Sequence, residues 1–182
     1  MTRIIACFAL VLLPAWAQEI KFPASFEKLA AKAVETVDLK LDSSTLKTAG
    51  AFLSSKEPDQ AKAKKLVSGL KGVYVKSFEF AKEGEYAESD LEAIRSQLNA
   101  PEWVQTVKVR SKKDGESVDI YFKKQGEATT GMVIISAEPT ELTVVRIDGT
   151  IDLEQLGELG GQFGIPNVHM EHGDKKLRTT GK

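Results

Sequence analysis

Apolar and polar residues alternate most clearly in the second half of the chain, as in strands whose two faces have different surroundings. The alternation predicts four strands, near residues 103–110, 117–124, 129–137 and 141–148. Asp114-Gly115, Gln125-Gly126 and Pro139 lie between them. Since short turns join antiparallel neighbours, we expect these segments to form a four-strand antiparallel meander.

Within the second of these strands, Ile120 and Phe122 alternate with Asp119 and Tyr121. In a half-buried antiparallel strand one such set faces the core and the other faces water. We therefore expect Ile120 to be buried on the core face and Tyr121 to point the other way.

The first half of the chain has mainly helical spacing, with apolar residues three and four positions apart. Helices are predicted over about 25–37, from Ser43-Ser44, from Pro58 to Gly72, and over 90–99 with a Ser89 and Glu92 capping box. Strands are predicted over 37–41 and 73–81. A last short helix follows Asp152 and runs through Leu159. This order predicts an α+β fold, an antiparallel or mixed sheet with a C-terminal four-strand meander and helices packed mainly on one face.

The N-terminus has the features of a secretory signal peptide. Arg3 precedes an apolar run from Ile4 to Leu13, which ends in Ala15-Trp16-Ala17. The run is too short to span a bilayer comfortably, so we expect cleavage before Gln18, a periplasmic or secreted location and no membrane span afterwards. The expected organisation is a signal peptide at 1–17, a single α+β domain at 18–165 and a flexible polar tail at 166–182.

The charge balance excludes a strong general attraction to nucleic acid. The formal net charge is −1 and becomes −2 when Arg3 leaves with the signal peptide. Two basic clusters could meet an anionic partner or a lipid head group, but solvated surfaces are the favoured explanation. One cluster comprises Lys62, Lys64, Lys65 and Lys71, and the other comprises Arg110, Lys112, Lys113, Lys123 and Lys124, expected at one end of a hairpin.

Candidate chemistry is sparse. His169 and His172 are the two histidines, and the single cysteine, Cys7, lies in the signal peptide. Two imidazoles in a polar tail do not complete a metal shell, and they make a rigid catalytic triad improbable. The stretch Gly157 to Gly164 lacks the lysine and hydroxyl ending of a phosphate-binding loop. We therefore assign no catalytic, cofactor-binding or metal-ligating residue, and no cofactor.

Four segments carry a family resemblance, namely residues 41–44, 66–80, 118–121 and 144–153. Their main motifs are Gly69-Leu70-Lys71 leading into a strand, and a strand that runs into Gly149-Thr150-Ile151-Asp152-Leu153. The chain resembles the exported bacterial family known as domain of unknown function 4252 (DUF4252). The resemblance implies an envelope protein without assigned catalytic residues. It also implies a link to envelope signalling, because genes of this family are associated with those of extracytoplasmic sigma and anti-sigma factors.

Together these observations favour an exported, non-enzymatic binding or interaction module whose partner is another envelope protein. The alternative is a small enzyme or hydrophobic-ligand carrier with a pocket between sheet and helices. A sizeable enclosed cavity with converging polar groups would favour the alternative, whereas a filled core with an exposed patch would favour interaction. The oligomeric state is left open.

Overall fold

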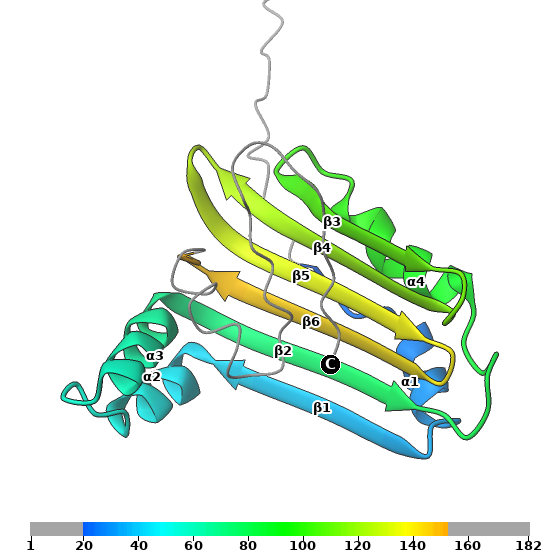
Figure 1. Ribbon diagram of the computed structural model, residues 1–182, viewed down its shortest axis with the longest axis horizontal. Helices are drawn as coiled ribbons and strands as arrows, with labels where there is room; N and C mark the ends of the chain where they lie inside the picture. The colour runs from blue at the N-terminus through cyan, green and yellow to red at the C-terminus, as the bar shows by residue number, and fades with distance from the viewer. Residues whose placement is uncertain (1–19, 153–182) are drawn as a thin grey trace, which may run out of the picture.

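A computed structural model describes residues 20–152 of the 182-residue chain, and the structural statements below concern those residues. Six strands form one antiparallel sheet in the order β1-β2-β6-β5-β4-β3 (Figure 1). Their bounds are β1 Glu35–Asp42, β2 Leu70–Glu79, β3 Trp103–Ser111, β4 Glu116–Gln125, β5 Ala128–Glu138 and β6 Glu141–Gly149. The predicted α+β class and the C-terminal meander β3-β4-β5-β6 are confirmed.

The turns of the meander lie where the sequence places them. Gly115 and Gly126 have φ values of 71° and 62°, a left-handed conformation that glycine adopts without a steric penalty. The β3–β4 and β4–β5 connections are correspondingly short. Local turn chemistry therefore fixes both hairpins of this part of the sheet.

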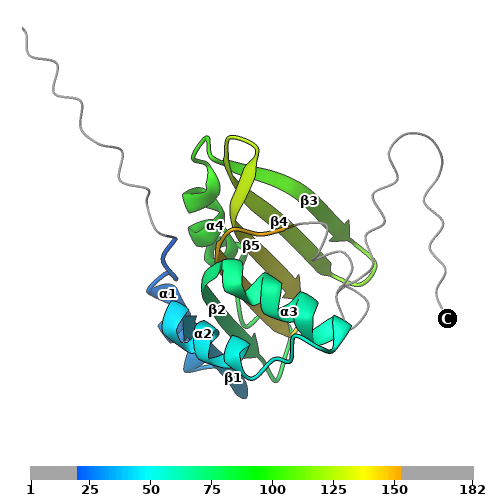
Figure 2. The same cartoon turned by 90° about the vertical axis from the view of Figure 1, so that its left-hand side faces the viewer.

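Helices α1 (Ser25–Ala30) and α4 (Glu88–Arg95) lie on the same side of the sheet, behind it in Figure 1. Helices α2 (Ser43–Ala51) and α3 (Pro58–Gly69) form a hairpin that joins β1 to β2 at the end of the sheet (Figure 2). A 3₁₀ turn, η1 (Ser96–Leu98), extends α4. The helices that cover the sheet thus lie mainly on one face, as expected.

Two helix boundaries differ from the sequence prediction. The first helix ends at Ala30, and the Val34 amide already donates to the carbonyl of Glu79, so the following residues are a strand rather than helix. The third helix ends at Gly69 rather than Gly72. In both places pairing with β2 overrides the local helical periodicity.

The helix caps also differ in detail. Asp42, not Ser43 or Ser44, caps α2, because its carboxylate accepts from the Thr45 amide at 2.8 Å. The hydrogen bonds from the Thr45 amide and hydroxyl lower the pKa of Asp42. At α4, the Asp90 carboxylate accepts from the Ala87 amide at 3.0 Å, in place of the predicted Ser89 and Glu92 pair.

The main core lies between the sheet and the two covering helices. Phe26 of α1 meets Phe78 of β2 edge to face, with ring centroids 5.3 Å apart. Ile94 of α4 is 1% exposed. The sheet contributes fully or nearly fully buried side chains from five strands: Phe78, Leu142, Val144, Val133, Ile135, Ala137, Tyr121 and Trp103. Apolar side chains therefore fill the space between sheet and helices.

The prediction for the faces of β4 is wrong in direction. The residues do alternate, but Asp119 and Tyr121, 0% and 9% exposed, are on the face that α1 and α4 cover. Ile120 is half-buried on the opposite face, in a second small apolar cluster. The reason is that Arg95 and Arg110 form ion pairs with Asp119 inside the protein. This polar position therefore does not mark the solvent side.

Candidate interaction surface

The side of the sheet away from α1 and α4 is also strongly apolar, and we call it the open face. Two complete cross-strand rows of apolar residues run over all six strands. The first row is Leu39, Val75, Val145, Ile134, Ile120 and Val107, and the second is Leu41, Val73, Ile147, Met132, Phe122 and Val104. A sheet with two apolar faces can pack on both sides.

Cover on the open face is incomplete within residues 20–152. Ile151, which follows β6, is 6% exposed and packs with Phe122 and Met132. Its amide donates to the carbonyl of Thr129 at 2.9 Å. Towards the two edges of the sheet, Leu39 and Val104 remain 40% and 46% exposed. Exposed apolar side chains on a sheet face are a feature of interaction sites.

One end of the open face is acidic. Four glutamates from four adjacent strands stand side by side in the pairs Glu35 with Glu79, Glu79 with Glu141, and Glu141 with Glu138. We call them the glutamate row. Glu141 accepts hydrogen bonds from the hydroxyls of Ser77 and Thr143. In the described part of the chain no lysine or arginine forms an ion pair with any of the four.

Like charges directly opposite one another in a sheet are destabilising. The glutamate row therefore costs stability in the isolated domain. A hollow of about 170 Å³ beside it is lined by Glu35, Val37, Ser77, Glu79 and Glu141. This end of the open face can accept a cationic group, which would relieve the repulsion.

On the helix-covered face, Asp119 is the centre of a buried ion-pair cluster. Arg110 binds both of its carboxylate oxygens, at 2.7 and 2.8 Å. Arg95 of α4 donates from Nε at 2.9 Å, and Gln105 donates at 2.8 Å. The Asp119 carboxylate thus links α4 to β3 and β4, a structural role.

The surroundings of this cluster alter two pKa values. Burial tends to lower the pKa of Arg95, but its bonds to Glu92, Glu88 and Asp119 outweigh burial and raise that pKa. Burial, with a smaller contribution from the charge of Asp119, raises the pKa of Tyr121. Both shifts favour the forms already present at neutral pH, a cationic Arg95 and a neutral Tyr121.

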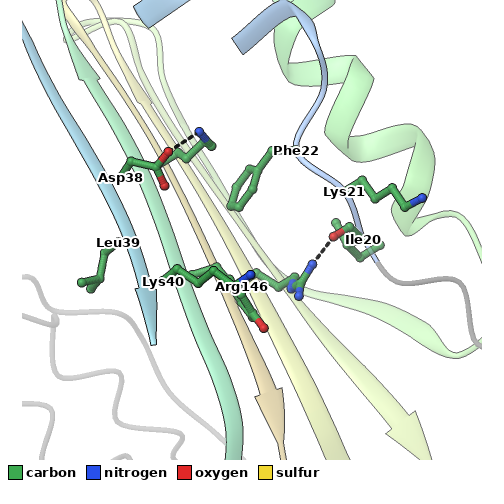
Figure 3. A pocket seen from close by; sticks show the side chains of 9 residues that line it. Ile20, Lys21, Phe22, Asp38, Leu39, Lys40 and Arg146 are labelled. Atoms are coloured by element: carbon green, nitrogen blue, oxygen red, sulfur yellow. Dashed lines mark hydrogen bonds and ion pairs between the residues drawn. The ribbon is translucent and has the colours of Figure 1, made fainter. Parts of the chain in front are cut away.

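A second polar feature is an open hollow of about 320 Å³ at the β1 side of the helix-covered face (Figure 3). The Arg146 guanidinium lies 4.0 Å from the centre of the Tyr74 ring and donates to the Ile20 carbonyl. It also pairs with Asp148 at 2.9 Å. Lys76 pairs with Asp38 at 2.7 Å. These charged groups are mutually engaged, and the hollow is broad and exposed.

The candidates from the sequence fare differently. His169, His172 and the Gly157 to Gly164 stretch lie outside the described residues, as do the predicted tail at 166–182 and helix through Leu159. Between residues 20 and 152 no three potential ligands are grouped so as to hold a metal ion. In the same part of the chain no helix is long and apolar enough to cross a membrane.

The second basic cluster is not gathered as expected. Antiparallel pairing places Lys123 opposite Trp103, at the far end of the hairpin from Arg110. Lys123 and Lys124 lie over aromatic rings, and Lys124 donates to the Thr129 hydroxyl. In the first cluster, Lys64 donates to the Leu53 carbonyl and to Ser55. The second set therefore does not gather at one end of the hairpin.

Sequence reasoning missed the glutamate row because its members come from four separate segments. Glu35 and Glu141 are more than a hundred positions apart in the sequence, and only the register of the sheet brings them to one end. Alternation within each strand gives the face of a residue, but strand order is needed to show which residues are neighbours.

Comparison with known families identifies one match. The family described as "Domain of unknown function (DUF4252)" matches residues 29–159, which includes every strand of the sheet. Among curated proteins and solved structures, neither comparison finds a match.

Proposed function

We propose that this chain, which belongs to the DUF4252 family, is an exported, non-enzymatic binding module of the bacterial envelope. The observation that carries the proposal is the open face, where two six-residue apolar rows adjoin four glutamates. Both features are costly for an isolated soluble domain. A role in envelope signalling would follow from binding another envelope protein there.

The occupant that fits is a protein segment with apolar side chains along its length and lysine or arginine at one end. The apolar side chains would pack on residues such as Val75, Val145 and Ile134, and the cations would lie at Glu79 and Glu141. Electrostatic complementarity of this kind fixes orientation and accelerates association more than it adds affinity. The segment would thus bind in one direction along the strands.

A carrier or enzyme with a pocket between sheet and helices has less support. That space is filled in the described part of the molecule, where Phe26, Ile94 and Ile135 are at most 1% exposed. A bound ligand needs a preformed cavity with a few converging polar groups. The polar cluster nearest to this space, at Asp119, already satisfies its own charges.

Peptide binding tests the proposed site. We expect a synthetic amphipathic peptide with lysines at one end to bind the exported chain. The double variant Glu79→Gln with Glu141→Gln should weaken this binding about 5- to 30-fold, because it removes two exposed charge pairs that contribute about 0.5–1 kcal/mol each. The same double variant should be no less stable than wild type, because it removes like charges that face each other. Fluorescence titration and denaturant unfolding measure the two quantities.

Glu57→Gln with Asp59→Asn, at the start of α3, is the matched control and should leave the affinity unchanged. A peptide with glutamate in place of lysine should bind more weakly.

Truncation after Asp152 decides whether the chain itself supplies the occupant. If only the truncated chain binds the peptide, residues 153–182 fill the open face and the partner proposal is wrong.

Export makes a separate prediction. Cleavage after Ala17 gives a mature chain that starts at Gln18, because Ala15-Trp16-Ala17 is the small-x-small site that follows the apolar run. The intact mass of material recovered from the periplasm or medium should correspond to residues 18–182. Recovery of a chain that retains Met1, or of one lipidated at Cys7, would contradict the predicted processing.

A further inference from the structure

The sheet has two outer strands, and they differ in how well they could accept another strand. β3 contains an irregularity between Gln105 and Val107, which interrupts its pairing with β4. Such bulges protect sheet edges from unwanted pairing. β1 has an unbroken register with β2 over all eight residues, from Glu35 to Asp42, and contains no proline. Its outer edge is therefore a regular template for a further strand.

The side chains of β1 alternate between charge and apolar surface. Val37, Leu39 and Leu41 are on the open face, and Asp38 and Lys40 are on the opposite face. Val37 and Leu39 are 44% and 40% exposed, large values for apolar residues in a strand. The Asp38 ion pair with Lys76 uses the Oδ2 atom.

We propose that β1 pairs in antiparallel orientation with β1 of a second copy, about a two-fold axis at Leu39. Residues directly opposite each other in an antiparallel pair point to the same face of the sheet. Registers that keep the open faces of the two copies on one side therefore differ from one another by an even number of residues. With Leu39 opposite Leu39 of the other copy, Asp38 lies opposite Lys40 and Lys40 opposite Asp38. On the open face, Val37 lies opposite Leu41 twice. Every central contact is then complementary.

The neighbouring registers are not complementary. A shift of two residues in one direction places Asp38 opposite Asp38 of the second copy, and a shift in the other direction places Lys40 opposite Lys40. Like charges directly opposite each other are destabilising, so charge selects the register centred on Leu39. The interface is isologous, which closes the assembly at two copies. The two sheets then form one sheet whose open faces are continuous, a consequence that goes beyond the proposed function.

Charge exchange tests the register. We expect sedimentation of the mature wild-type chain to show a concentration-dependent monomer–dimer equilibrium. Asp38→Lys should abolish the dimer because lysines then face each other, and Lys40→Asp should abolish it because aspartates do. An equimolar mixture of the two variants should dimerise again, since each lysine then faces an aspartate.

Lys113→Asp, in the exposed turn between β3 and β4, is the control and should leave the dimer unchanged. Recovery in the mixture requires both variants to be folded, so loss of folding cannot imitate the expected result. A wild-type chain that stays monomeric at the highest attainable concentration overturns the proposal. Single variants that still dimerise, or a mixture that stays monomeric, overturn this register. Peptide binding to the open face by monomeric protein would leave the proposed function intact.

Discussion

Replacement of Asp119 by alanine should lower the free energy of unfolding by about 3–5 kcal/mol, because it removes one member of a buried ion pair and leaves the largely buried Arg95 without its buried partner. Asp119 is 0% exposed, and it binds Arg110 and Arg95. Without the carboxylate, Arg95 keeps only Glu88 and Glu92 at the surface, and Gln105 loses its acceptor. Urea unfolding of the purified domain measures the loss.

Glu92→Ala is the matched comparison, since it also removes a carboxylate from Arg95. The Glu92 side chain is 59% exposed, and exposed pairs contribute only about 0–1 kcal/mol. A cost for Asp119→Ala as small as that of Glu92→Ala would show that the cluster does not hold α4 on β3 and β4. The assignment of Asp119 to a structural role would then fail.

The second large effect concerns two adjacent isoleucines of β5 that lie on opposite faces. Ile135→Ala should cost about 2–5 kcal/mol, because the side chain is 0% exposed in the filled core. Ile134→Ala should cost clearly less, because Ile134 is only half-buried on the open face. Denaturant unfolding of both variants, with the same change one residue apart, gives the comparison.

The same two variants should separate stability from binding. Ile134→Ala removes a side chain from the first apolar row and should weaken binding of the lysine-ended peptide. Ile135→Ala should leave the affinity of the folded fraction for this peptide unchanged. Equal stability losses would mean that both faces of β5 are packed to the same degree. The open face would then not be available to a partner.

The meander was predictable because its information is local. Gly115 and Gly126 lie in the turns, and alternation locates all four strands to within two residues of their observed ends. Pro58 likewise begins α3 as expected for proline in a first helical turn. These features depend on residues that are near one another in the sequence.

The faces of β4 were not predictable in the same way. The alternation of Ile120 with Tyr121 is correct, but the covered face cannot be read from hydrophobicity when both faces are apolar. Asp119 indicates solvent until the positions of Arg95 and Arg110 are known, and Arg95 comes from a helix more than twenty residues earlier. The match to the DUF4252 family identifies the family of the chain but names no ligand.

A methyl NMR titration tests the central claim most directly, with each strand supplying its own control. On addition of the lysine-ended peptide, the account predicts shifts for methyl groups of the open face, such as Ile134 and Val145, with little change at their neighbours Ile135 and Val144. The neighbours point into the filled core, between the sheet and α1 and α4. Shifts confined to Ile135 and Val144, or to residues around Arg146, would contradict binding at the open face.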